Sequence, residues 1–166
     1  MKRVLITGMS GTGKSTLIRE LAARGYKAVD ADDPGWSELR SVPGLSGETG
    51  EPEWVWREDR IQDLLAMEDA EVLFLSGCAS NQVSFYPQFD HIVLLCVPPS
   101  LLIERLAKRT TNTFGKRPEE LARVLQDQRT VEPLLRGVAT LELDTSSALE
   151  QVLSAVLRLV QPETGD

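Results

Sequence analysis

In the stretch GMSGTGKS at residues 8–15, four residues separate Gly8 from the triplet Gly13-Lys14-Ser15. An apolar run from Val4 to Thr7 precedes it, and apolar residues follow at helical spacing. Glycines let backbone N–H groups turn inward around an anion, and the following helix adds its positive dipole end. Spacing and context predict a Walker A phosphate loop, in which Lys14 contacts the β- and γ-phosphates of ATP and Ser15 binds Mg²⁺.

The motif also predicts which residues surround the bound nucleotide. These are Gly8, Ser10, Gly11, Thr12, Gly13, Lys14, Ser15 and Thr16.

Strand-like and helix-like segments alternate along the chain. Strands are expected at residues 4–7, 26–29, 72–75, 92–97 and 141–143, and helices after residue 15 and at 57–69, 99–109, 119–130 and 147–160. Continuous apolar strands in such an alternation predict an α/β fold, a P-loop NTPase three-layer sandwich with a central parallel five-stranded sheet. Residues 1–166 are expected to form one domain. The Pro- and Gly-rich residues 33–53 predict a loop-rich insert with one helical turn at most.

Composition restricts the partners. The net charge of −7 disfavours a broad surface for polyanions, so nucleic acid is not expected as the main partner. Cys78 and Cys96 lie in or beside apolar runs, as buried free thiols do in a reducing compartment. No run is long enough for a signal peptide or a membrane span. A cytoplasmic protein that does not bind membranes is therefore expected.

Other classes of P-loop protein lack their signatures here. The Asn-Lys-x-Asp motif of GTPases is absent, and Asp32-Asp33-Pro34-Gly35 follows the wrong strand for their Asp-x-x-Gly. Leu45-Ser46-Gly47-Glu48 is only faintly similar to a transporter ATPase signature, and the chain is too short for that domain.

From the phosphate loop onward the chain resembles the shikimate kinase and adenylate kinase-like group of small P-loop kinases, an AAA ATPase-like small kinase. Asp30-Ala31-Asp32 is similar to their Asp-x-Asp. The resemblance implies that Asp30 supports Mg²⁺ and that Asp32 contacts the hydroxyl that receives phosphate, as a metal-assisting and a proton-accepting carboxylate would. Asp33 adjoins them, so the assignment shifts by one residue in an alternative alignment, and an acidic turn is the structural alternative.

The expected substrate-binding insert spans residues 33–70. Trp56-Arg57 resembles the aromatic-Arg pair of shikimate kinases, which implies that Arg57 binds an anionic group of the substrate. Trp54 and Trp56 either line the ligand or pack in a core. After the strand at 72–75, Gly77 and Cys78 stand where shikimate kinases have three glycines that touch substrate, so shikimate itself is in doubt. Ser80, Asn81 and Gln82 either bind a polar substrate or cap a helix.

A lid is expected at residues 109–118. The resemblance implies that Arg105 and Arg109 contact ATP and that Arg109 and Arg117 act in catalysis, with Lys116 as a substitute. A solvated basic loop is the alternative.

Two further segments carry the resemblance. Arg129 corresponds to a second substrate-binding arginine, although the spacing to Pro133 is longer than in the family and Arg136 competes for the role. Asp144 and Thr145 stand in the loop that borders adenine, or cap the last helix.

The sequence therefore predicts an ATP- and Mg²⁺-dependent kinase that transfers the γ-phosphate to a hydroxyl of a small molecule, polar or anionic. The alternatives are a nucleoside or nucleotide kinase and a regulatory nucleotide-binding module with little turnover. His91, the only histidine, is expected to be structural. The acceptor, the oligomeric state and the choice between ATP and GTP remain open at this stage.

Overall fold

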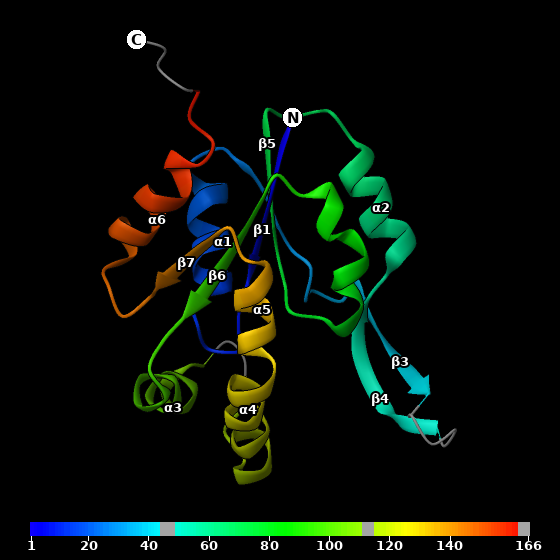
Figure 1. Cartoon of the computed structure of the whole chain (residues 1–166), viewed down its shortest axis with the longest axis vertical. Helices are drawn as coiled ribbons and strands as arrows, with labels where there is room; N and C mark the ends of the chain where they lie inside the picture. Colours follow the sequence, from blue (N-terminus) through cyan, green and yellow to red (C-terminus); the bar gives the residue numbers. More distant parts are fainter. Residues whose placement is uncertain (44–48, 111–114, 163–166) are drawn as a thin grey trace.

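The computed structural model describes residues 1–43, 49–110 and 115–162. Five strands form one parallel sheet in the order β2-β5-β1-β6-β7. They are β1 (Lys2–Thr7), β2 (Lys27–Asp30), β5 (Val72–Ser76), β6 (His91–Cys96) and β7 (Leu141–Asp144). The predicted parallel five-stranded sheet is confirmed (Figure 1).

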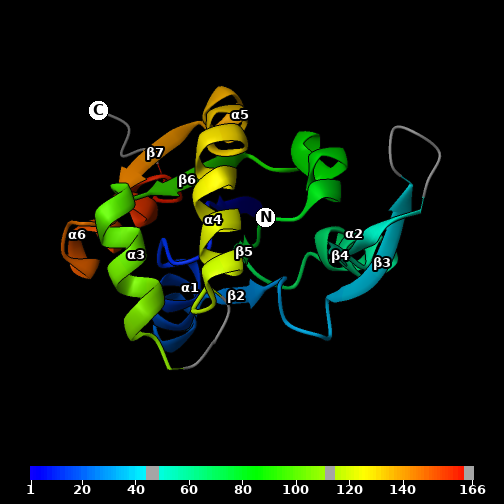
Figure 2. The ribbon, with the colours of Figure 1, turned by 90° about the horizontal axis from the view of Figure 1, so that it is seen from below.

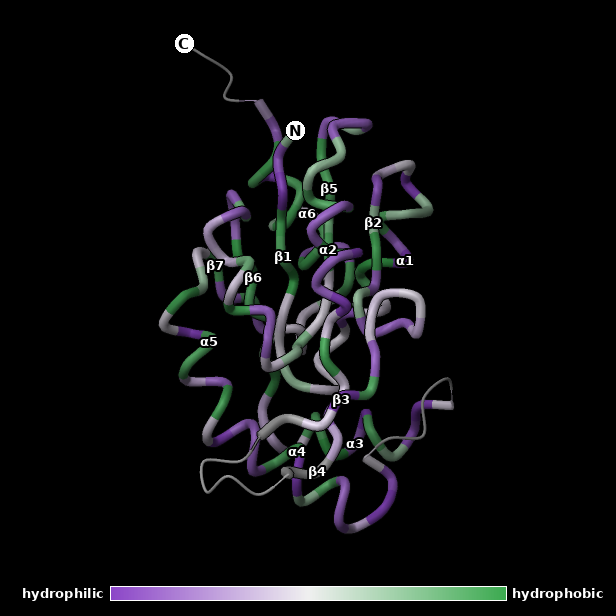
Figure 3. The backbone as a smooth tube through the Cα atoms, turned by 90° about the vertical axis from the view of Figure 1, so that its right-hand side faces the viewer, coloured by the Kyte–Doolittle hydropathy of each residue, from purple (hydrophilic) through white to green (hydrophobic). Residues whose placement is uncertain are grey.

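Helices cover both faces of this sheet. α1 (Lys14–Ala23) and α6 (Leu149–Arg158) pack on one face, over a core that includes Val4, Leu17 and Val156. α2 (Glu58–Ala66) and the 3₁₀ helix η1 (Ser80–Gln88) pack on the other, over Leu5 and Leu75. The hydrophobic stretches of β1 and β5 run through the middle (Figure 3). The sheet is buried on both sides, which explains its continuous apolar strands.

Of the remaining helices, two lie toward the carboxyl ends of the strands, and the third packs on β6 through Leu135 and Leu94 (Figure 1). α3 (Pro99–Lys108) packs on α4 (Pro118–Thr130) through Leu102, Leu106 and Val124. α5 (Glu132–Val138) follows α4 after a break at Val131. The sequence analysis missed α5 and η1. Both contain a proline, and α5 is only 7 residues long, so neither shows a clear helical period.

The prediction of a loop over residues 33–53 is wrong. β3 (Ser37–Pro43) and β4 (Thr49–Trp56) form an antiparallel hairpin. Prolines argue against a strand inside a sheet because they donate no backbone hydrogen bond. In a two-stranded hairpin each strand has a free edge, so Pro43 and Pro52 are tolerated.

The hairpin and α4 both project beyond the carboxyl ends of the sheet, on opposite sides (Figures 1 and 2). β1 lies between β5 and β6, and the chain leaves β1 and β6 toward opposite edges of the sheet. Open α/β sheets bind ligands outside the carboxyl ends of the strands at such a reversal. The loop at residues 8–15 lies there. In the part of the chain that the structure describes, no helix is both long and apolar enough to cross a membrane.

Candidate active site

Three glycines shape the loop between β1 and α1. Gly8, Gly11 and Gly13 have φ values of 148°, 86° and 102°, which residues with a side chain rarely adopt. A Cβ atom at Gly8 would overlap the carbonyl oxygen of Leu95. The loop therefore needs glycine for its turn and for its close approach to β6.

Lys14 closes the loop into a ring. Its Nζ donates hydrogen bonds to the carbonyl oxygens of Gly8 at 2.7 Å and Met9 at 3.0 Å. The Thr12 hydroxyl donates to the same Met9 oxygen at 2.7 Å. The residue is only 8% exposed, so its charge is held inside the loop. A buried cation inside a ring of turned backbone suits the phosphates of a nucleotide.

Ser15 and Asp30 lie together, as the sequence predicts for a metal pair. The Ser15 hydroxyl donates a hydrogen bond of 2.9 Å to the Asp30 carboxylate, linking α1 to the end of β2. A hydroxyl and a carboxylate are hard oxygen donors, which fit Mg²⁺ bound partly through water and phosphate. Among the described residues, no group of three or more His, Cys, Asp or Glu could hold a metal unaided.

Asp32 lies at the edge of the same site. Its backbone N–H donates to the Asp30 carboxylate at 3.0 Å. The residue is exposed, and its carboxyl accepts a hydrogen bond from the backbone of Cys78 in the chain after β5. Desolvation raises the pKa of Asp32, and the charge of Lys14 opposes that shift while Asp30 adds to it. A carboxylate with a raised pKa close to the phosphate loop is suited to accept a proton.

A cleft of about 570 Å³ runs along the phosphate loop. Ten of the predicted site residues line it: Ser10, Gly11, Gly13, Lys14, Ser15, Thr16, Asp32, Arg105, Arg109 and Thr145. Its volume lies within the usual range for a site that binds a small molecule.

Arg105 joins the phosphate loop to the loop after β7. Its guanidinium donates to the Thr12 carbonyl oxygen at 3.4 Å and to the Thr145 hydroxyl at 3.0 Å, and it also contacts the Thr145 carbonyl oxygen. The Thr145 hydroxyl in turn donates to the Thr12 carbonyl oxygen at 2.6 Å. Asp144 instead accepts two hydrogen bonds from Ser146, which lower its pKa and close the turn. Of this pair, only Thr145 lines the cleft.

The structure describes only the two ends of the predicted lid at residues 109–118, because residues 111–114 lie outside the described residues. Arg109 donates to the Ser10 hydroxyl at 3.2 Å and lines the cleft. Burial lowers the pKa of its guanidinium. Arg117 and Lys116 are exposed, and Arg117 is the N-cap of α4. The structure therefore brings Arg109, but neither Arg117 nor Lys116, to the cleft.

Of the two interpretations of Trp56, the structure supports packing in the core. Trp56 is fully buried and packs on Phe85. A Cβ atom added at Gly77 would lie 2.9 Å from Nε1 of Trp56, so the space beside this glycine is filled by the indole ring. Trp54 is 60% exposed on the hairpin. Arg57 is half-buried at the start of α2, where its Nε donates to the Ser37 carbonyl oxygen at 3.5 Å.

Cys78 is a half-buried free thiol close to Asp32 and Lys14. Burial raises its pKa, which the charge of Lys14 partly offsets. Asn81 bonds both backbone groups of Trp56, at 3.0 Å and 2.9 Å, and the buried Gln82 donates to the Thr7 hydroxyl at 3.1 Å. Asn81 and Gln82 thus hold η1 to the sheet and hairpin, which favours their structural interpretation.

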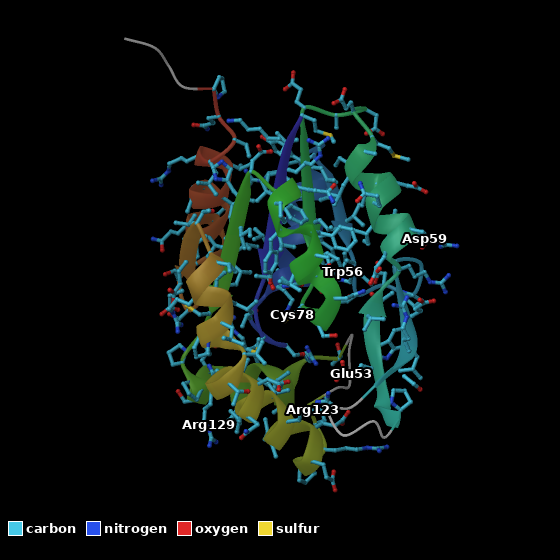
Figure 4. All side chains as sticks on the ribbon, turned by 45° about the vertical axis from the view of Figure 1, so that its right-hand side comes forward. Glu53, Trp56, Asp59, Cys78, Arg123 and Arg129 are labelled. Atoms are coloured by element: carbon cyan, nitrogen blue, oxygen red, sulfur yellow. The ribbon has the colours of Figure 1, made fainter. Side chains whose placement is uncertain are left out.

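Neither Arg129 nor Arg136 lines the cleft that contains Asp32. Arg129 is exposed on the side of α4 away from the hairpin (Figure 4). Arg136 is paired with Glu142 at 2.9 Å and Glu132 at 3.0 Å. The geometry does not bring either arginine to the candidate site.

The sequence analysis missed several residues that line the cleft: Leu17, Arg19, Leu95, Leu101, Glu104, Lys108, Ser147, Leu149 and Val152. They come from α1, α3, α6 and the strand ends, and belong to no motif. The only available signal was their position in segments that follow parallel strands.

Comparison with known proteins supports the fold. The AAA domain family model matches residues 4–126. A curated Archaeoglobus fulgidus protein described as “Putative adenylate kinase” is 29% identical over 159 residues, covering 95% of this chain and 82% of its own length.

Solved structures of small kinases have the same fold. A shikimate kinase from Acinetobacter baumannii, in complex with shikimate, aligns with a TM-score of 0.64 at 21% identity, covering 96% of this chain and 93% of its own. A gluconokinase from Sinorhizobium meliloti aligns with a TM-score of 0.57 at 20% identity, covering 96% and 91%. The family match spans most of the chain and the phosphate loop is intact, so the chain belongs to the AAA domain family and is one of the small P-loop kinases.

Proposed function

We propose that the protein transfers the γ-phosphate of ATP, with Mg²⁺, to a hydroxyl group of a small metabolite. The observation that carries the proposal is the position of Asp32. Its carboxyl lines the same cleft as Lys14 and Ser15, two residues beyond Asp30. A nucleotide-binding module alone has no use for a proton acceptor beside its phosphate site.

Each residue then has a distinct role. Lys14 and the loop N–H groups hold the phosphates, and Ser15 and Asp30 would hold Mg²⁺, which supplies positive charge at the β- and γ-phosphates. Asp32 accepts the proton of the attacking hydroxyl. Arg105 fixes the loop that borders the base, and Arg109 adds positive charge near the transferred group. Both cysteines are free thiols, which fits the cytoplasm as the compartment.

A nucleoside or nucleotide kinase is the second candidate. The observation in its favour is the Archaeoglobus relative, which matches 95% of this chain and is described as an adenylate kinase in its given name. In that case the group that receives phosphate belongs to a nucleoside or to its monophosphate.

The test is ATP consumption with Mg²⁺ over a panel of polyols, sugars, hydroxy acids, nucleosides and nucleoside monophosphates, with mass spectrometry of the products. We expect one phosphorylated product that Lys14→Ala protein does not form. ATP binding without product from any acceptor would contradict the proposal and favour a regulatory module.

A further inference from the structure

α4 presents one face to the hairpin and another to solvent. Arg123 and Asp127 are four residues apart on this helix and therefore share a face. Arg129 follows Asp127 by two residues, which places it on the far side. Figure 4 agrees, with Arg123 on the hairpin side near Glu53 and Arg129 on the outer side.

Charges from α4 and from the hairpin meet in this region. Burial raises the pKa of Asp127, while Arg123 lowers it and Glu53 raises it further. Glu53 is half-buried on β4, and one of its carboxylate oxygens accepts a hydrogen bond of 3.3 Å from the Ser80 hydroxyl. Asp127 also acts on the Cys78 thiol, whose own pKa burial raises. Arg123 lies near Glu53 (Figure 4), and Glu53 is bonded to Ser80, so the shared face of α4 lies toward the chain that follows β5. In the same stretch, the backbone of Cys78 donates a hydrogen bond to the Asp32 carboxylate.

Arg123 has its hydrogen-bond donors available. Within the described part of the chain its guanidinium makes no hydrogen bond or ion pair, whereas Arg136 is bound to Glu142 and Glu132. Arg123 is exposed and acts on the charge of Asp127, so its five donors remain available to a ligand.

The charges of this region limit the chemistry of the acceptor. Three carboxylates (Glu53, Asp127, Asp32) and two cations (Arg123, Lys14) make this a region of mixed charge, in which a carboxylate, a phosphate or an ammonium group would each meet side chains of its own sign. A hydroxyl group suits both kinds of side chain, because it donates to a carboxylate and accepts from a guanidinium. Neighbouring hydroxyls on one molecule can satisfy both at once.

We propose that Arg123, Glu53 and Asp127 form the acceptor-binding wall and that the acceptor is an uncharged polyhydroxylated molecule, a sugar or a polyol. This inference rests on the proposed function. It differs from the expectation that Arg57 and Arg129 bind a polar or anionic substrate, and it assigns specificity to a residue that no motif identifies.

The test measures phosphoryl transfer to matched acceptors: neutral sugars and polyols, the corresponding sugar acids, and nucleoside monophosphates. Arg123→Gln is compared with Arg129→Gln, the rival on the same helix, and with Arg158→Gln, an exposed arginine on α6 that controls for the loss of one positive charge. Thermal unfolding checks that each variant is folded.

We expect a neutral polyol to be the best acceptor. Arg123→Gln should raise its KM about tenfold or more, from the loss of charge-assisted hydrogen bonds, with the KM for ATP unchanged. Asp127→Asn should do the same, and Arg158→Gln should have no effect. Preference for a sugar acid or a nucleoside monophosphate would overturn this inference and leave the proposed function standing. An Arg129→Gln effect as large as that of Arg123→Gln would also overturn it. No product from any compound would overturn both.

Discussion

The Ser15 hydroxyl donates a hydrogen bond of 2.9 Å to the Asp30 carboxylate, so the first turn of α1 and the end of β2 meet at one point. Ser15 directly follows Lys14, whose ammonium group is held by the loop carbonyls. The phosphate loop and the proposed metal pair are thus built as one unit.

Asp30→Asn should raise the Mg²⁺ concentration needed for half-maximal turnover about tenfold, because a neutral amide is a weaker partner for a hard cation than a carboxylate. The measurement is a Mg²⁺ titration of turnover at saturating ATP. Asp33→Asn tests the alternative assignment by one residue, and Asp69→Asn, remote on the surface, is the control. An unchanged Mg²⁺ requirement in Asp30→Asn would argue against the metal role.

Asp32→Asn should preserve ATP binding and remove turnover, since an amide accepts no proton at neutral pH. The pKa of Asp32 is raised above its ordinary value of 3.8, so in the unmodified protein turnover should fall with acid at a pH above that value. The measurements are ATP binding by calorimetry and the pH dependence of turnover. Full activity of Asp32→Asn would show that the proton acceptor is another group.

The same substitution has an expected effect on stability. A carboxyl whose folded-state pKa is raised favours folding in its protonated form, so its contribution is present at low pH and is lost as pH rises through the folded pKa. At neutral pH the neutral Asn removes this cost, and the melting temperature of Asp32→Asn should be equal or higher. If the melting temperature of Asp32→Asn at pH 7 were lower than that of the wild-type protein, the raised pKa of Asp32 would be contradicted.

Arg105→Lys should raise the KM for ATP about tenfold. Lysine keeps the charge but loses the planar fork that joins Thr12 to both polar groups of Thr145. Steady-state kinetics in ATP is the measurement. Arg24→Lys, which alters an arginine paired with Glu20 and Glu150 away from the cleft, is the matched control and should leave the KM unchanged.

Gly77→Ala should lower the free energy of unfolding by about 1–3 kcal/mol, the usual cost of overfilling a packed core. The new Cβ would lie 2.9 Å from Nε1 of the buried Trp56. Gly137→Ala is the control, because nothing lies within 4 Å of its added Cβ. In α5 it should be neutral or stabilise by up to about 1 kcal/mol. Equal stabilities of the two variants in urea unfolding would refute this account of Gly77.

The sequence by itself determined the phosphate loop, the parallel sheet and the approach of Asp30 to Ser15. Gly8, Gly13, Lys14 and Ser15 are close in sequence, and their chemistry requires that spacing. Asp30 follows the next predicted strand, so the parallel sheet alone brings it to the same edge. These features depend on local geometry or on one rule of topology.

Only the tertiary structure decided the arrangement of the hairpin, Trp56 and α4, where we propose that the acceptor binds. The hairpin forms because its two strands pair with each other, and no local pattern of the Pro- and Gly-rich residues 33–53 revealed that. Trp56 fills the space at Gly77, and Arg123 rather than Arg129 faces Glu53, because the rotation of α4 is set by its packing through Val124 on Leu102 and Leu106. Long-range packing determines which face of a helix is turned inward. The sequence spacing of Arg123 and Arg129 does not reveal which of the two lies on that face.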